Sequence, residues 1–472
     1  MMDCFAKPGA AAVPIAAVAA KDFKSWLAGR DASTRAWVAA NGFSPKAGRH
    51  LAVPNAKGRI GLVVLGRGDD ASMWDFGDLP KALPAGRYRL EGFDGKDDQD
   101  GATAAALAWA LGSYQFARYK AGAETPAKSV AKLVWPAAAD RAKVEREAKG
   151  TFLCRDLINM PTNDMGPADL ADAARALGRT FKAKVRVIEG DNLLKKNFPA
   201  IHAVGRASDR APRLIDLTWG PARAPKVTLV GKGVCFDTGG LDIKSAVGMK
   251  YMKKDMGGAA HVLGIAHVLM AAGAKIRLRV LVPAVENSIS GNAMRPLDIV
   301  PTRRGTTVEI GNTDAEGRVI LADALWEAVA EAPDLLIDYA TLTGAARVAL
   351  GTELPALFCN DDGFAADILS AGTAVEDPLW RMPLWDGYRS MVEGSQADLT
   401  NAPEGGYAGA ITAALFLEHF ATPVKGKPIP WAHVDLMAWN RSSRPGRPTG
   451  GEAMGLRAMA RAILDRYGKA GK

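Results

Sequence analysis

Two carboxylates and a guanidinium stand at alternate positions in residues 312–318, which read Asn-Thr-Asp-Ala-Glu-Gly-Arg. They are Asp314, Glu316 and Arg318. Alternate side chains of an extended strand point the same way, so strand geometry would direct all three to one face. Carboxylate oxygen is a donor that suits hard and borderline divalent ions. This short stretch therefore predicts part of a metal site.

A second group of polar residues lies upstream, in residues 231–240, which read Gly-Lys-Gly-Val-Cys-Phe-Asp-Thr-Gly-Gly. Its chemistry-bearing members are Lys232 and Asp237, and Lys244 and Asp255 follow shortly after. Carboxylates gathered closely repel one another unless a cation lies between them. The two groups together predict a pair of divalent metal ions bridged by carboxylate.

Each acidic residue also has a plain structural interpretation. Asp237 could simply form a turn, and Asp255 could cap the helix that follows it. Asp314 and Glu316 could supply negative charge to the N-terminus of a helix. A histidine-zinc site is disfavoured, because none of the six histidines pairs with another at ligand spacing and no HExxH is present.

Composition limits the class of protein. The chain has 472 residues, enough for two domains, and 60 Lys and Arg against 51 Asp and Glu give a net charge of +9. No run of five basic residues occurs, so a basic solvated surface is favoured over a nucleic-acid interface. The four cysteines form no CxxC pair, which fits reduced thiols in a cytoplasmic protein, and no apolar run is long enough to span a bilayer.

The elements that must position these residues are predicted from apolar patterns. Strands are predicted at residues 60–65, 226–230, 276–282, 335–339 and 430–437, and helices at 103–119, 257–272 and 319–332. Thr103 would cap the first of these helices. Alternation of strands and helices predicts an α/β fold, in which loops at strand ends carry the functional residues.

Three segments are predicted. They are a small N-terminal α/β domain (1–135), a connecting helix and linker broken by prolines (136–165), and a larger C-terminal α/β domain with a mixed central sheet flanked by helices (166–472).

The strings VGKGVCFDTGG, KKDMGGAA and NTDAEGR resemble those of the leucyl aminopeptidases, also called cytosol aminopeptidases. The resemblance continues in residues 155–163, 341–344, 408–414 and 431–435, and covers roughly residues 150–472. It implies that 166–472 form a catalytic metallopeptidase domain. It also implies release of N-terminal amino acids, with leucine-like or broad specificity, from peptides with a free N-terminus.

The resemblance further implies a metal centre with two divalent ions per subunit, Mn²⁺ or Zn²⁺, with Mg²⁺ and Co²⁺ as further candidates. Asp237 and Glu316 would bridge the ions, and Asp314 would complete the first site. Lys232 and Asp255 would complete the second, for which the lysine amine must be neutral.

It assigns roles to five more residues. Lys244 would stabilise the oxyanion of the attacked carbonyl, and Arg318 would hold a bicarbonate ion that acts as general base. Met252, Thr341 and Gly344 would lie near the pocket for the first side chain. The family is hexameric, so the resemblance also implies a homo-hexamer.

The chain departs from the family at two places. Leu297 stands where the family usually has glycine, and residues 441–452 are unlike those of the best-known members, so the resemblance does not fix the preferred side chain. Two alternatives stay open: another two-metal carboxylate hydrolase, such as a phosphoester hydrolase, and an additional DNA-binding role.

Overall fold

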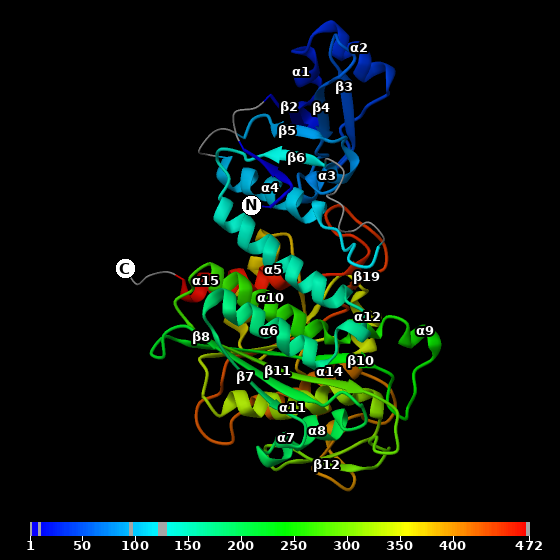
Figure 1. Ribbon diagram of the computed structural model, residues 1–472, viewed down its shortest axis with the longest axis vertical. Helices are drawn as coiled ribbons and strands as arrows, with labels where there is room; N and C mark the ends of the chain where they lie inside the picture. Colours follow the sequence, from blue (N-terminus) through cyan, green and yellow to red (C-terminus); the bar gives the residue numbers. More distant parts are fainter. Residues whose placement is uncertain (1, 8–10, 94–97, 121–129, 469–472) are drawn as a thin grey trace. The chain divides into compact units, whose positions relative to one another are not determined.

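The computed structural model describes residues 2–7, 11–93, 98–120 and 130–468, and the chain divides into two compact units. Unit 1 comprises Met1–Phe152 with Arg441–Thr449, and unit 2 comprises Leu153–Asn440 with Gly450–Lys472. Helix α5 (Arg141–Asn159) contains the first point of division. Figure 1 shows the elements of each unit.

Unit 1 is built on a six-stranded sheet of order β1-β6-β5-β2-β4-β3, in which only β3 runs antiparallel to its neighbour among the described strands. The strands are β1 (Phe5–Ala6), β2 (Val13–Val18), β3 (His50–Pro54), β4 (Ile60–Gly66), β5 (Gly86–Leu90) and β6 (Ala131–Val134). The helices are α1 (Phe23–Ala28), α2 (Ala32–Ala40), α3 (Leu79–Ala82) and α4 (Gln99–Ser113).

Both faces of this sheet are covered, and β4 shows why. Leu62 and Val64 belong to the apolar cluster that includes α2, whereas Val63 and Leu65 belong to the cluster that includes α4. Successive side chains of a strand point to opposite faces, so a continuous apolar run is what a doubly covered strand requires.

Residues 441–449 belong to unit 1 although their neighbours in sequence belong to unit 2. They follow β19 (Trp439–Asn440) and precede β20 (Gly450–Gly451), two short strands that pair with each other. Within unit 1, the guanidinium of Arg447 lies 4.3 Å from the centre of the Trp74 ring. This long hairpin loop therefore completes a unit whose other residues come from the beginning of the chain.

Unit 2 contains a nine-stranded mixed sheet of order β16-β15-β18-β14-β9-β11-β8-β7, with β10 paired to β11 off this path. The central strands β9, β11, β14 and β18 are mutually parallel, and β7, β8 and β15 introduce the antiparallel pairs. The strands are β7 (Lys184–Glu189), β8 (Arg213–Trp219), β9 (Lys226–Gly231), β10 (Gly233–Asp237), β11 (Arg277–Asn287), β14 (Leu335–Ala340), β15 (Ala356–Cys359), β16 (Trp380–Arg381) and β18 (Trp431–Asp435). A small separate sheet contains β12 (Ile299–Pro301), β13 (Thr307–Glu309) and β17 (Leu399–Thr400).

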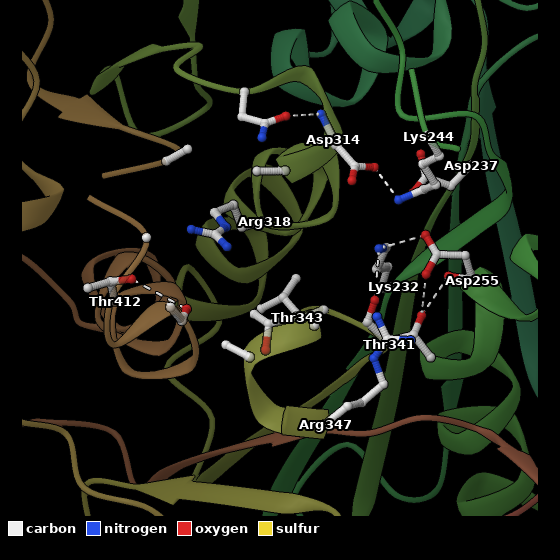
Figure 2. Close-up of a pocket in the computed structure, with 18 of the residues that line it drawn as sticks. Lys232, Asp237, Lys244, Asp255, Asp314, Arg318, Thr341, Thr343, Arg347 and Thr412 are labelled. Atoms are coloured by element: carbon white, nitrogen blue, oxygen red, sulfur yellow. Dashed lines mark hydrogen bonds and ion pairs between the residues drawn. The ribbon is translucent and has the colours of Figure 1, made fainter. Parts of the chain in front are cut away.

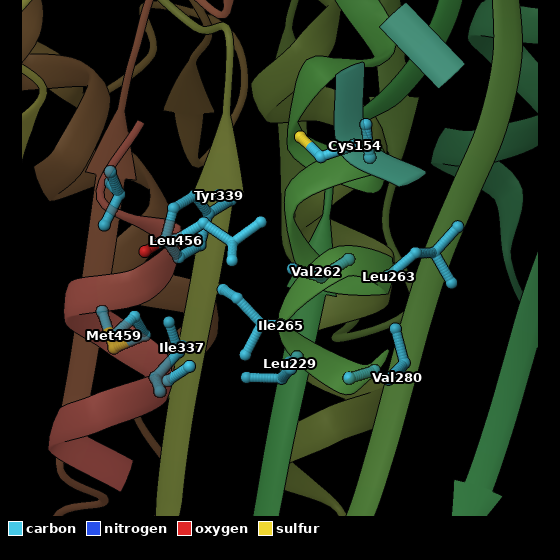
Figure 3. Packing of buried hydrophobic residues seen from close by; sticks show 14 of the residues in the cluster. Cys154, Leu229, Val262, Leu263, Ile265, Val280, Ile337, Tyr339, Leu456 and Met459 are labelled. Carbon is cyan, nitrogen blue, oxygen red and sulfur yellow. The ribbon is translucent and has the colours of Figure 1, made fainter. Parts of the chain in front are cut away.

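Helices cover both faces of this sheet (Figure 1). One apolar cluster joins the sheet to α6 (Pro167–Phe181), α10 (Gly257–Ala271), α13 (Asp362–Ala374) and α15 (Leu456–Tyr467). Figure 3 shows this packing, with Ile265 of α10 between strand residues Leu229 and Ile337 and the Leu456 end of α15. The opposite cluster includes α8 (Pro199–Gly205), α11 (Glu316–Val329) and α14 (Gly409–Ala421); shorter helices are α7 (Asn192–Lys195), α9 (Ala246–Met249) and α12 (Gly344–Leu350).

The predicted α/β class with a mixed sheet flanked by helices is confirmed. The helix predicted from Thr103 begins earlier, at Gln99, and ends at Ser113. Thr103 is buried inside α4 and does not cap it; its hydroxyl accepts the Asp140 backbone N–H at 2.9 Å. No helix among the described residues combines the length and hydropathy that crossing a bilayer demands.

Leu297 adopts a left-handed backbone conformation, with φ of 69° and a side chain that is 64% exposed. Glycine adopts this conformation without steric cost, whereas a residue with a Cβ is strained there. The backbone geometry therefore gives a physical reason for glycine at this position in the family that the sequence resembles.

Candidate active site

The charged residues of the sequence motifs meet beyond the carboxyl ends of the central strands of unit 2 (Figure 2). Lys232 follows β9, Thr341 follows the neighbouring strand β14, and Asp237 ends β10. Open α/β sheets bind ligands at this edge, because the loops that leave parallel strands converge there. The topology therefore brings together motifs that lie far apart in the sequence.

A cavity of about 350 Å³ lies at this edge. Nine of the ten residues singled out from the sequence line it: Lys232, Asp237, Lys244, Met252, Asp255, Asp314, Arg318, Thr341 and Gly344. The tenth, Glu316, is fully buried, and its Oε1 lies 2.9 Å from the Lys232 ammonium. The structure thus places all ten residues in one region, which their spacing alone could not establish.

Residues 314–318 do not form a strand, so the expected strand geometry is wrong. Asp314 lies in a 3-10 helix (Thr313–Ala315), and α11 begins at Glu316 with Arg318 in its first turn. The Asn312 side chain accepts the Asp314 backbone N–H at 2.7 Å, which starts the helical turn. The side chains therefore diverge: Glu316 contacts Lys232, Asp314 contacts Lys244, and Arg318 donates to the Asn401 carbonyl at 2.6 Å.

Asp255 does not cap α10. It lies in the 3-10 helix Met252–Met256, and the residue at the cap position of α10 is Met256, which offers no side-chain hydrogen bond. The Asp255 carboxylate instead faces the cavity, where Oδ1 accepts the Thr341 hydroxyl at 2.8 Å and Oδ2 lies 2.7 Å from the Lys232 ammonium. Its position thus has no capping explanation.

Three buried carboxylates lie close enough to share metal ions. Asp237, Asp255 and Glu316 each offer an oxygen atom, and these atoms all lie within 4.8 Å of one another. Among the described residues, neither oxygen of Glu316 nor Oδ2 of Asp255 makes a hydrogen bond, although the Lys232 ammonium lies near two of them. Buried carboxylate oxygens without hydrogen bonds are costly, and a bound cation removes that cost.

Neighbouring groups fix these carboxylates in place. The Asn287 amide donates to Asp237 Oδ1 at 2.8 Å, and the Gly239 backbone N–H donates to the same oxygen at 2.9 Å. Lys232 donates to the Thr341 carbonyl at 3.0 Å, and the Thr341 hydroxyl in turn holds Asp255. Partners of this kind orient metal ligands before the ion arrives.

Gly317 leaves room for the Lys232 side chain. A Cβ at position 317 would lie 2.6 Å from Lys232 Cε and 2.7 Å from its Nζ, closer than atoms in contact can approach. Only glycine lets the lysine amine lie against the first turn of α11. The Glu-Gly-Arg order of the motif therefore has a steric reason in addition to its charges.

Burial and mutual repulsion shift the protonation of the acidic residues. Burial, with the charge of Asp237, raises the pKa of Asp314 to about 6 and raises that of Glu316 well above its usual value. Burial alone would lower the pKa of Lys232, but Asp255, Glu316 and Asp237 raise it above its ordinary range. The carboxylates of the site thus lie close enough to disfavour one another's charged form.

Two cations in the cavity were not singled out from the sequence. Lys254 is 3% exposed, and burial lowers its pKa to about 8; Arg347 lies in α12 on the Thr341 side of the cavity (Figure 2). The doubled lysine before Asp255 was the available signal for Lys254. Nothing in the local sequence of Arg347 indicates that α12 directs it toward the cavity.

Comparison with known proteins identifies the family to which the chain belongs. The model of the cytosol aminopeptidase family catalytic domain matches residues 152–460, and that of the M17 aminopeptidase N-terminal domain matches residues 13–136. The chain belongs to the cytosol aminopeptidase family. Like other members, it is a metal-dependent aminopeptidase, a hydrolase that removes N-terminal residues from peptides.

Individual proteins and solved structures are similar to this chain over most of its length. A probable cytosol aminopeptidase of Roseiflexus castenholzii is 41% identical over 369 residues, 75% of this chain and 74% of that protein. The crystal structure of the cytosol aminopeptidase of Coxiella burnetii has 50% identity and a TM-score of 0.93, covering 98% of this chain and 100% of the other. The bottromycin maturation enzyme BotP, solved in complex with Mn, has 32% identity and a TM-score of 0.85, covering 97% and 100%. These relatives lend no support to the phosphoester hydrolase or DNA-binding alternatives.

Proposed function

We propose that Asp237, Glu316, Asp314, Lys232 and Asp255 hold two divalent metal ions. The observation that supports this most is the buried group of Asp237, Asp255 and Glu316 oxygens within 4.8 Å, several of which lack hydrogen bonds. Asp237 and Glu316 would bridge the ions, Asp314 would complete one site, and Lys232 with Asp255 the other. Oxygen donors with one amine suit Mn²⁺ or Zn²⁺, and Mg²⁺ and Co²⁺ are further candidates.

The lysine must be neutral to bind a metal ion, whereas the surrounding carboxylates raise the pKa of Lys232. A dication bound to those same carboxylates would oppose this effect and favour the neutral amine. Lys232 is held against Gly317 and donates to Thr341, so its nitrogen stays beside Asp255 and Glu316. The contacts of the side chain therefore fit the role of a ligand.

When bound, two such ions would acidify a shared water and polarise the scissile carbonyl. The chain's own residues would do the rest. The Lys244 ammonium, now beside Asp237 and Asp314, would donate to the oxyanion that develops on the attacked carbonyl. The substrate's free α-amine would bind at one of the ions, beside Asp255, which would restrict cleavage to the N-terminal bond.

Arg318 would hold a bicarbonate ion that serves as general base. Its guanidinium is buried and donates to Asn401, while its Nε has no hydrogen-bond partner among the described residues. A planar guanidinium with a free donor suits a small planar anion. Burial lowers the pKa of Arg318 to about 10, so the group stays charged at neutral pH.

The site also carries Met252, Thr341 and Gly344 in its lining, and we propose that they contact the first side chain of the substrate. We further propose a homo-hexamer in the cytoplasm; the name cytosol aminopeptidase carried by the relatives supports the location.

The proposal is tested with aminoacyl anilides assayed after chelation and reloading with Mn²⁺, Zn²⁺, Mg²⁺ or Co²⁺. Free aminoacyl substrates should be cleaved only by reloaded enzyme, and N-acetylated ones should be inert because they lack the α-amine. Comparable turnover of free and acetylated substrates would refute the amine-binding role. Phenyl phosphate esters serve as the control for phosphoester hydrolysis, and light scattering measures the assembly.

A further inference from the structure

The cavity contains two further cations that, among the described residues, make no hydrogen bond with a carboxylate of the site. Lys232 is paired with Asp255 and Glu316, and Lys244 with Asp237 and Asp314. Lys254 and Arg347 line the same cavity and serve neither as metal ligands nor as the oxyanion donor in the function proposed above.

The N–H groups of the Lys254 ammonium have no hydrogen-bond acceptor among the described residues. Its side chain is buried, its ammonium makes no hydrogen bond among the described residues, and Asp255 Oδ1 approaches it only to 4.0 Å. If Asp255 binds a metal ion, its charge is committed there. A buried ammonium without a counter-ion is unfavourable, so a ligand that brings a carboxylate to this place would be stabilised.

Arg347 is similarly unpaired. It makes no ion pair among the described residues, and its hydrogen-bond acceptor is the sulfur of Met437 at 3.6 Å, which is a weak one. It lies on α12 only three residues after Gly344, which also lines the cavity. A guanidinium with free donors is suited to a carboxylate.

We infer that Lys254 and Arg347 select substrates whose first residue is acidic, aspartate or glutamate. The inference rests on the proposed function, because it takes the α-amine to bind beside Asp255. The first side chain leaves the carbon that bears this amine, so it must lie close to Asp255 and therefore close to Lys254. The same two cations repel a lysine or arginine side chain.

Glutamyl and glutaminyl anilides form the matched substrate pair, since they differ in charge but hardly in shape. Wild-type enzyme loaded with Mn²⁺ should cleave the glutamyl anilide with a kcat/KM about tenfold or more above that of the glutaminyl anilide, and lysyl and arginyl anilides should be poorest. Calorimetry should show tighter binding of free glutamate than of glutamine. Equal values for the two anilides would overturn the inference.

The variants Lys254→Met and Arg347→Met should lower kcat/KM for the glutamyl anilide by about tenfold to a hundredfold, and that for the leucyl anilide little. Arg347→Glu should shift preference toward lysyl and arginyl anilides. Lys253→Met is the control, because the Lys253 ammonium donates to the Asn159 carbonyl at 2.6 Å and does not line the cavity. Equal losses for glutamyl and leucyl substrates would assign the two cations a structural role and refute the proposal.

A substrate's terminal carboxylate is the other source of the same charge. Leucylglycine and its amide separate the two sources, because only the first carries that carboxylate. Preference for leucylglycine without discrimination between glutamyl and glutaminyl anilides would overturn the inference in favour of the peptide end. Cleavage of every aminoacyl anilide regardless of charge would refute this inference alone. Cleavage of none would refute the proposed function.

Discussion

Replacing Gly317 by alanine tests the proposed metal role of Lys232 without touching any ligand. The new Cβ would lie 2.7 Å from Lys232 Nζ, whereas ordinary van der Waals contact begins at 3.4 Å. The amine must therefore retreat by about 0.7 Å, the difference of these two distances. Bonds between a metal and its ligands tolerate deviations of only about 0.2 Å, so the lysine could no longer bind the ion in place.

The magnitudes separate the metal effect from the effect on folding. Overpacking a buried site costs about 1–3 kcal/mol, and alanine in place of glycine in a helix returns up to about 1 kcal/mol. The net loss of stability should therefore stay below about 3 kcal/mol. Displacing a group that positions or forms a metal site should weaken binding of that ion by about tenfold to a hundredfold.

The assay is metal content by mass spectrometry during titration with a chelator, combined with thermal unfolding. We expect Gly317→Ala to lose one of two ions at a lower chelator concentration than the wild type. Gly291→Ala is the matched control, because its added Cβ meets no atom within 4 Å. Wild-type affinity for both ions in a folded Gly317→Ala protein would refute the role of Lys232 as ligand.

Four shorter tests address other residues. Lys244→Ala and Arg318→Ala should each lower turnover by about 100-fold with both metals retained, and an empty site by metal analysis would contradict their assigned roles. Lys232→Ala should weaken one metal site selectively, and at low pH that site should empty first in the wild type; two equivalent sites in a titration would argue against it. Burial lowers the pKa of His261 to about 4, so its contribution to stability is present above the unfolded value near 6.5 and is lost as pH falls toward 4. The loss in the free energy of unfolding between pH 6.5 and pH 4 is on the order of 3 kcal/mol. Chemical unfolding measured across this pH range should show a smaller decrease for His261→Gln than for the wild type. Leu297→Gly should raise stability by about 1 kcal/mol, because the exposed side chain is strained at φ of 69°, and an unchanged melting temperature would show that the strain is absent.

Elements with strong apolar patterns were predictable from the sequence. The runs that became β4, β9 and β14 are largely apolar because both faces of their strands are covered. The helix starting at Gly257 is apolar all round for the same reason. In each case burial on all sides requires apolar residues at most positions, and the local sequence shows that requirement.

The predictions that were wrong concern places where hydrogen bonds of a polar side chain set the local structure. Asp314, Glu316 and Arg318 alternate as on a strand, yet Asn312 starts a helical turn that separates them. Threonine is a common helix-capping residue, but the Thr103 hydroxyl accepts a hydrogen bond from a residue distant in sequence. Such choices depend on partners that the local sequence does not contain.

The candidate site was identified largely through long motifs, while its unpaired charges were not. Lys254 and Arg347 stand in helical segments where a cation usually faces solvent. Only the three-dimensional structure shows that Lys254 and Arg347 line the same cavity as Asp255.

The loop 441–449 has a consequence for how the protein is made. A ribosome releases the N-terminal unit first, and domains usually fold in that order. Here the ring of Trp74 meets its cationic partner Arg447 only after residues 153–440 have been synthesised. At 5–20 residues per second this is a delay of roughly 15 to 60 s. During that interval unit 1 lacks residues 441–449. A nascent chain stalled before residue 441 should therefore expose the Trp74 surface to chaperones and proteases.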